Sequence, residues 1–207
     1  MNDFEKALSL YYSPDQLLTI QKTRVGIAGA GGLGSNIAVC LARSGFKDLE
    51  IIDFDVVAVK NLNRQYYFLE DAGKPKVEAL AERLKKINPD ILVKTSRIKI
   101  DGGNIAGLFG DRDIIFEAFD GAGSKALLLE HFGDSNKLLI FGNGMAGISN
   151  QREIKIKKIK ENIIIVGDGT TDIKDAPPFA PRVTACASLM AACALEAILT
   201  PPGSIQM

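Results

Sequence analysis

The stretch Gly26–Asn36, GIAGAGGLGSN, decides the fold class of this chain. A short β-type run leads into its glycines and an apolar pattern with helical spacing follows, so the stretch predicts a strand, a tight turn and a helix. Such a turn brings phosphate close to the backbone amides of a helix N-terminus, whose dipole favours negative charge. The glycines expected to do this are Gly29, Gly31, Gly32 and Gly34. The same pattern also suits a turn that needs small residues only for packing.

Strand and helix patterns alternate on both sides of this stretch. Strands are expected at 24–30, 48–55, 91–98, 113–119 and 137–144, and helices at 14–22, 32–46, 74–89, 103–109, 124–136 and 183–199. The alternation predicts an α/β fold with a Rossmann-like, mostly parallel sheet flanked by helices. We interpret the whole of 1–207 as one domain with an N-terminal helical lead-in over 1–22.

The character of the chain changes after Gly147. Charged and apolar residues alternate over 152–168, which predicts two antiparallel strands that extend the sheet and turn near Glu161 and Asn162. The segment 168–182 is rich in Gly, Pro, Asp and Thr, so we expect a mobile surface connection there. This connection is also a candidate for a lid over a bound substrate.

Composition limits the classes of partner. The chain has 25 basic and 25 acidic residues, so no global positive field attracts nucleic acid. Its three cysteines form no CxxC pair, which favours reduced thiols in the cytoplasm and argues against a structural zinc site. We see no secretory leader, and no apolar run approaches the roughly 20 residues that cross a bilayer. The sequence therefore predicts a soluble, cytoplasmic protein.

Two basic residues follow the second predicted strand. Arg64 and Lys76 should lie beyond its carboxyl end, where open α/β sheets bind ligands. Asp53, at the end of that strand, could accept hydrogen bonds from ribose, and the glycine turn and Asp53 alone suit NAD and ATP equally. The two cations favour a triphosphate over a nicotinamide ring. Alternatively both are exposed surface cations, and Asp53 and Asp55 are caps or turn residues.

Asp120 ends the fourth predicted strand and should emerge at the same edge of the sheet. Mg²⁺ usually binds through one or two carboxylates together with substrate phosphates, so Asp120 is the candidate metal ligand. The alternative is an N-cap for the helix that follows.

The motifs together resemble a known family. GAGGLGSN, DFD with NLNRQ, GKPK, INPD and EAFD, in this order and spacing, are similar to the ThiF/MoeB group of ubiquitin-activating-enzyme-like adenylyltransferases over about 24–183. The short chain and the motifs MAG, VGDGT and APRV resemble the short ThiF branch of that group, which activates the sulfur carrier protein of thiamine biosynthesis.

The resemblance implies ATP and Mg²⁺ as cofactors and a site for each motif. The glycine turn would hold phosphates, Asp53 with Asp55 would meet the ribose, and Asp120 would bind Mg²⁺. The residues implied around the triphosphate are Asn61, Arg64, Gln65 and Lys76. Members are generally homodimers in which an N-terminal arginine reaches the partner's nucleotide, and this sequence offers only Lys6 and Lys22 before Thr23.

The implied reaction joins the C-terminal glycine carboxylate of a ubiquitin-like carrier to AMP and releases pyrophosphate. A carboxylate that is already ionised needs no general base, so His131 is expected to be structural. Cys186 lies near a helix N-terminus and could carry a covalent step, but we expect it to be a buried packing residue. Rival functions are adenylation of a modified tRNA or a peptide, an NAD-dependent dehydrogenase, and an inactive partner subunit.

Overall fold

The computed structural model describes residues 1–119, 122–148 and 153–200. In these ranges the strands are β1 (Arg24–Ala28), β2 (Asp48–Ile52), β3 (Leu92–Ser96), β4 (Ile114–Glu117), β5 (Leu138–Gly142), β6 (Lys155–Lys160) and β7 (Ile163–Gly167). The helices are α1 (Asp3–Leu8), α2 (Pro14–Lys22), α3 (Gly32–Arg43), α4 (Lys76–Ile87), α5 (Ile105–Phe109), α6 (Ala122–Phe132) and α7 (Ala180–Leu199), with short 3₁₀ turns η1 (Val59–Asn61) and η2 (Leu69–Asp71).

The strands form one sheet in the order β3-β2-β1-β4-β5-β7-β6. All neighbouring pairs are parallel except β6 with β7, which pair as an antiparallel hairpin. This confirms the predicted fold class, including the hairpin beyond Gly147. The strand order reverses direction between β1 and β4, and such a switch point leaves a crevice at the carboxyl ends of the two strands.

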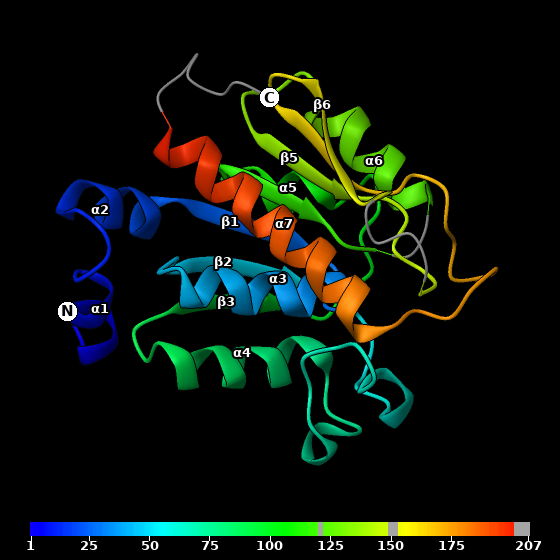
Figure 1. Ribbon diagram of the computed structural model, residues 1–207, viewed down its shortest axis with the longest axis horizontal. Helices are drawn as coiled ribbons and strands as arrows, with labels where there is room; N and C mark the ends of the chain where they lie inside the picture. Colours follow the sequence, from blue (N-terminus) through cyan, green and yellow to red (C-terminus); the bar gives the residue numbers. More distant parts are fainter. Residues whose placement is uncertain (120–121, 149–152, 201–207) are drawn as a thin grey trace.

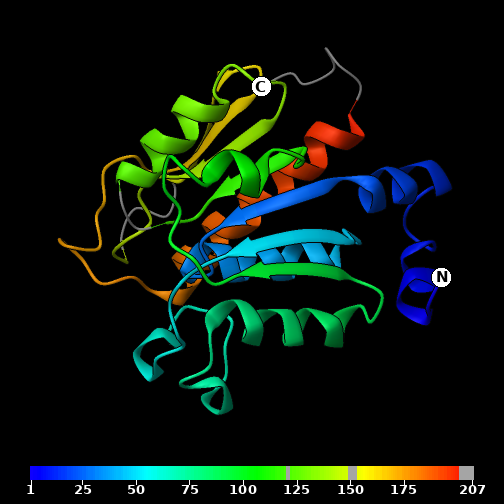
Figure 2. The ribbon, with the colours of Figure 1, turned by 180° about the vertical axis from the view of Figure 1, so that it is seen from behind.

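Helices cover both faces of the sheet (Figure 1). Right-handed crossovers place α3 and α4 on one face, where α7 packs against α3. Figure 2 shows α5 and α6 on the opposite face. Each face has its own apolar core, and because both are covered, β4 is buried along its whole length.

Helix α7 differs from the sequence-based expectation in two ways. It begins at Ala180, three residues before the predicted start at 183, because Pro181 occupies its first turn, where a missing N–H costs nothing. Within the described ranges it is also the one helix whose 20 residues and apolar composition would suffice to cross a membrane, so the expectation that no run is long enough was wrong. Its buried residues pack on α3, β5 and β7, as in the core helix of a globular domain.

The lead-in consists of α1 and α2, which lie at the amino ends of the strands (Figure 1). Ser13 and Gln16 form a capping box at the start of α2, and Glu5 of α1 pairs with Lys47 at 2.7 Å. Lys6 and Lys22 therefore lie at the opposite end of the sheet from the glycine turn of their own chain.

Candidate functional site

The glycine turn connects β1 to α3 as predicted. Gly29 follows β1 and its N–H donates to Ile52 O at 2.8 Å, which ties the turn to β2. A Cβ on Gly34 would lie 1.8 Å from Gly29 O, so only glycine allows α3 to start this close to the turn. No described side chain caps α3, and its first turn contains no acidic residue. The first amides of α3 are therefore open to an anion.

Asp53 is a buried carboxylate that holds this turn. Its two oxygens accept hydrogen bonds from Ala30 N at 2.7 Å and Asp55 N at 2.8 Å. Tyr67, which the sequence gave no reason to single out, donates its hydroxyl to Ala30 O at 2.7 Å. Burial raises the pKa of Tyr67, so the phenol stays a neutral donor. Side-chain hydrogen bonds to both the N–H and the carbonyl of Ala30 thus fix the turn.

Lys76 is not the exposed surface cation that the alternative reading allowed. Only 5% of the residue is exposed, and its ammonium lies 2.8 Å from Asp55 and 4.0 Å from Asp53. The Asp55 side chain is half exposed. The structure therefore places a fixed positive charge and two carboxylates beside the glycine turn.

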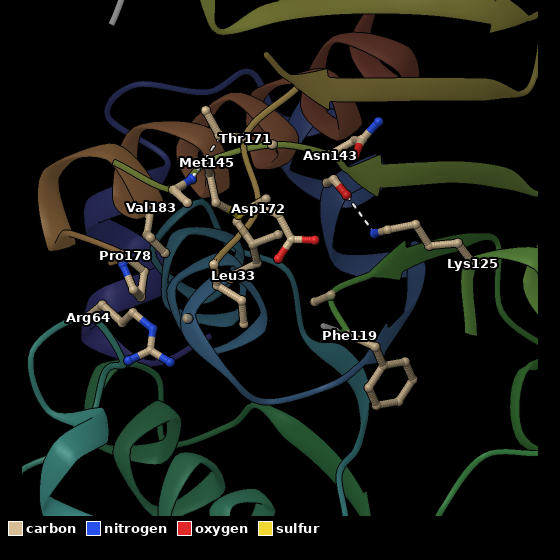
Figure 3. A pocket seen from close by; sticks show the side chains of 16 residues that line it. Leu33, Arg64, Phe119, Lys125, Asn143, Met145, Thr171, Asp172, Pro178 and Val183 are labelled. Atoms are coloured by element: carbon tan, nitrogen blue, oxygen red, sulfur yellow. Dashed lines mark hydrogen bonds between the residues drawn. The ribbon is translucent and has the colours of Figure 1, made fainter. Parts of the chain in front are cut away.

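A cavity of about 250 Å³ opens at the switch point between β1 and β4 (Figure 3). Its lining comes from the start of α3, the ends of β4 and β5, the segment after β7 and the start of α7. Its lining includes Arg64, Phe119, Lys125, Ala146, Thr171, Asp172 and Val183.

Arg64 lies in this cavity and Lys76 does not line it. The Arg64 guanidinium donates to Asn63 at 2.9 Å, and the backbone carbonyl of Arg64 accepts from Asn36 of α3 at 2.9 Å. The predicted residues therefore form two groups. Arg64 lies on the cavity side of the glycine turn, and Lys76 lies with Asp53 and Asp55 on the other side of that turn. Both groups adjoin the glycine turn.

Two further predicted residues flank Arg64 without lining the cavity. Asn61 accepts from Ala58 N at 3.0 Å and caps η1, so its described contact is structural. Gln65 is 8% exposed, its amide nitrogen approaches Gly31, and its buried oxygen has no hydrogen-bond partner among the described residues. A buried amide oxygen without a partner beside a phosphate-type turn suits a site that is completed by ligand or water. Asp120 lies outside the described residues.

Lys125 is a cavity residue that the sequence reasoning missed. Its ammonium, on α6, forms an ion pair with buried Glu117 of β4 and donates to Gly142 O of β5 at 2.6 Å. Glu117 also accepts from Phe119 N at 3.0 Å. The lysine thus braces the carboxyl ends of β4 and β5 at the side of the cavity remote from Arg64 (Figure 3). The sequence feature that pointed to Arg64, a basic residue soon after the carboxyl end of a strand, would also have pointed to Lys125.

Cys186 has the packing role expected for it. The residue is fully buried in α7, and its Sγ lies 3.5 Å from Val166 O. Burial raises the pKa of this thiol to about 12, so it stays protonated at neutral pH and is a poor nucleophile. His131 is exposed on α6 beside Phe132 and does not line the cavity.

The model of the ThiF family matches residues 5–205, nearly the whole chain. This chain belongs to the ThiF family. The resemblance expected from the motifs is therefore confirmed at the level of the family, and the finer resemblance to the short ThiF branch stays a prediction.

The curated relatives that match about three quarters of this chain are named as tRNA dehydratases, not as activators of a sulfur carrier protein. The tRNA threonylcarbamoyladenosine dehydratase of Haemophilus influenzae is 31% identical over 154 residues, 73% of this chain and 59% of the relative. The Escherichia coli enzyme of the same name is 30% identical over 77% of this chain and 57% of its own length. The E. coli molybdopterin-synthase adenylyltransferase is 34% identical over 49% of this chain and 41% of its length. The chain thus spans about three-fifths of the dehydratases.

Solved structures agree on the fold. E. coli TcdA, a tRNA N6-threonylcarbamoyladenosine dehydratase crystallised with ATP, superposes with a TM-score of 0.83 at 22% identity, covering 94% of this chain and 93% of that one. E. coli MccB with ATP gives a TM-score of 0.75 at 24% identity over 99% of this chain and 67% of that one.

Proposed function

We propose that this ThiF-family chain uses ATP to adenylate a carboxylate, forming an acyl-adenylate and releasing pyrophosphate. The observation that carries the proposal is the cavity at the switch point, which the uncapped α3 N-terminus and Arg64 line together. The amides would bind phosphate oxygens, and the Arg64 guanidinium would grip the leaving pyrophosphate with its planar fork. Lys76 would add a fixed positive charge on the other side of the turn.

The chemistry asks for positioning rather than for a general base. A carboxylate is ionised at neutral pH, so the site must hold it in line with the α-phosphate and neutralise charge on the leaving group. Mg²⁺ would neutralise phosphate charge when bound, and its predicted ligand is Asp120. The described residues contain no cluster of three metal-ligating side chains, but Mg²⁺ on a nucleotide needs only one or two carboxylates.

A modified tRNA is the acceptor that the comparisons favour. The two relatives that match about three quarters of this chain are tRNA threonylcarbamoyladenosine dehydratases, and a threonylcarbamoyl group carries a free carboxylate. This support is stronger than the support for the carrier protein that the motifs suggested.

The C-terminal glycine of a ubiquitin-like sulfur carrier is the second candidate, and charge favours it. The chain is neutral overall, and three of the four lysines of the edge strand β6 already have acidic partners, which lowers the positive charge that this strand offers to RNA. These pairs are Lys155–Glu153 at 3.6 Å, Lys158–Glu161 at 2.7 Å and Lys160–Asp134 at 2.8 Å. Assembly as a homodimer in the cytoplasm stays a prediction with either acceptor.

The test is ATP–pyrophosphate exchange with Mg²⁺ and each acceptor, followed by hydroxylamine trapping and a mass measurement. We expect exchange with one acceptor, and Arg64→Ala should lower it at least about a hundredfold. Arg43→Ala, at the far end of α3, is the matched control and should keep exchange within about twofold. No exchange with either acceptor would contradict the proposed activity, and binding of NAD in preference to ATP would favour the dehydrogenase.

A further inference from the structure

One buried ion pair joins two motifs that the proposed reaction leaves without a role. Asp168 belongs to VGDGT after β7 and Arg182 to APRV at the start of α7, and their side chains meet at 2.5 Å. The side chains are only 3% and 1% exposed, and Arg182 is the largest fully buried side chain among the described residues. Neither residue lines the cavity, but their neighbours Thr171, Asp172 and Val183 do.

Asp168 connects α7 to the cavity wall through Thr171. Its carboxylate accepts from Thr170 N at 2.7 Å, Thr171 N at 2.8 Å and the Thr171 hydroxyl at 2.7 Å. The same hydroxyl accepts from Ala146 N at 3.1 Å, on the segment after β5. Burial alone would raise the pKa of Asp168, but the hydrogen bonds from Thr171 and Thr170 and the Arg182 contact hold it well below its usual range. The carboxylate is therefore charged throughout the neutral range.

The segment after β5 is shaped to fit this carboxylate. Gly144 has φ +81°, and a Cβ there would lie 2.1 Å from Asp168 Oδ1. Gly144 O accepts from Asp168 N at 3.0 Å, and Gly147 N donates to Pro177 O at 3.0 Å. Backbone bonds thus join 143–147 to both ends of the connection at 168–178. Part of the segment expected to be a mobile surface connection is a fixed cavity wall.

We propose that Asp168 and Arg182 are positioning residues that set the shape of the acceptor side of the cavity. The nucleotide side consists of Gly32, in the turn after β1, and Arg64, in the loop after β2, and it has its own supports at Asp53, Tyr67 and Asn36. The wall formed by Ala146 and Thr171 depends on the ion pair, because the Thr171 hydroxyl joins Ala146 N to the Asp168 carboxylate that Arg182 holds. Loss of the pair should therefore weaken acceptor binding far more than ATP binding. This inference rests on the proposed adenylation.

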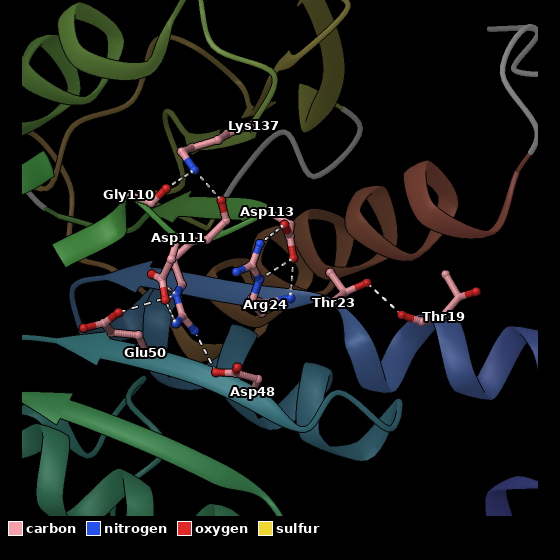
Figure 4. Close-up of polar contacts among 10 residues, drawn as sticks. Thr19, Thr23, Arg24, Asp48, Glu50, Gly110, Asp111, Asp113 and Lys137 are labelled. Carbon is pink, nitrogen blue, oxygen red and sulfur yellow. Dashed lines mark hydrogen bonds and ion pairs between the residues drawn. The ribbon is translucent and has the colours of Figure 1, made fainter. Parts of the chain in front are cut away.

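Arg182→Met tests the inference against a matched buried arginine. Arg112, 6% exposed, lies just before β4 and pairs with Asp111 at 2.6 Å and with Asp48, at the start of β2, at 2.7 Å; Figure 4 labels these two partners. Arg112→Met should also lower thermal stability, but it lies at the wrong end of the sheet to reach the cavity. We expect Arg182→Met to raise the acceptor KM at least about tenfold with the ATP KM within about twofold, and Arg112→Met to change neither. The acceptor is whichever of the two supports exchange in the unmodified protein.

Hydrogen exchange of the free protein separates the two proposals. Arg182→Met should speed amide exchange at 143–147 and 168–172 at least about tenfold while the glycine turn keeps its protection. This measurement does not depend on turnover. Absence of activity in the unmodified protein would overturn the proposed function, whereas the effect of the ion pair on the cavity wall would still be measured. If Arg182→Met does not fold, Thr171→Val removes the link to Ala146 with little change of volume and should show the same KM pattern. Equal acceptor KM values in the Arg182 and Arg112 variants would overturn the inference. A rise in amide hydrogen exchange that is equal over the whole chain in Arg182→Met would overturn it as well.

Discussion

The ammonium of Lys76 lies 2.8 Å from the carboxylate of Asp55 and 4.0 Å from that of Asp53. This arrangement makes Lys76 a fixed charge rather than a flexible surface cation. It also leaves two carboxylates beside one turn, with different duties. Asp53 orders the turn through Ala30, whereas Asp55 holds the Lys76 ammonium in place.

We expect Asp53 to hold the ribose as well as the turn. A carboxylate oxygen can accept more than one hydrogen bond, so the bonds from Ala30 and Asp55 leave capacity for hydroxyl groups. Asp53→Asn should therefore abolish the preference for ATP over 2′-deoxy-ATP in equilibrium binding. Asp55→Asn is the control and should keep that preference. The reverse pattern would assign the ribose to Asp55.

Two glycines of the turn should separate stability from binding. Gly34→Ala places a methyl group 1.8 Å from Gly29 O and should lower the free energy of unfolding by about 3 kcal/mol. In Gly31→Ala the nearest heavy atom to the new Cβ is 3.8 Å away, so stability should change by less than about 1 kcal/mol. ATP affinity should nevertheless fall about tenfold, because the methyl group adjoins the open amides of α3. Urea denaturation and ATP titration measure the two effects, and equal losses of stability would contradict the assignment.

Lys125 should matter for turnover and not only for folding. Lys125→Met removes the cation from the cavity and should lower kcat/KM at least about tenfold. Lys137 is the matched control, because its ammonium likewise donates to main-chain carbonyls, those of Gly110 and Arg112 at 2.7 Å each, but at the amino ends of the strands (Figure 4). Lys137→Met should keep kcat/KM within about twofold. Unchanged kcat/KM in Lys125→Met would limit Lys125 to a structural brace.

We expect the Cys186 thiol to be unreactive in the native protein. We also expect its ionisation to lower the free energy of unfolding at high pH. Burial raises its pKa to about 12 from an ordinary value of 9.0, so the thiol's contribution is complete below about pH 9 and is lost as pH rises toward 12. Urea unfolding from pH 7.5 upward should show a shallower decline for Cys186→Ala than for the unmodified chain. Parallel curves would rule out this linkage. In native protein, iodoacetamide should alkylate partly exposed Cys40 before Cys186.

The fold could be predicted because its signals are local. The glycine turn, the alternation of strands and helices and the charged–apolar pattern of β6 and β7 each extend over a few residues, and right-handed crossovers assemble them. The start of α7 was missed because Pro181 was taken to end a loop, although proline suits the first turn of a helix.

The site could be predicted only in part because its supports are not local. Arg64 follows a strand end and was found on that ground, but the burial of Lys76 depends on how the turn after β2 packs. Tyr67 on Ala30, Lys125 on Gly142 and Arg182 on Asp168 join residues 37, 17 and 14 positions apart. To predict such pairs, the register of the sheet must be known, and side-chain periodicity alone does not provide it.

The cavity is completed by the last described helix, since α7 contributes Val183 to its wall and packs along α3, some 150 residues earlier in the chain. During synthesis on the ribosome, the apolar side of α3 and the neighbouring face of β5 must therefore wait uncovered until α7 has emerged. The nascent chain is most exposed to aggregation in that interval, and a chaperone that shields α3 should raise the yield of folded protein more than one acting on the finished chain.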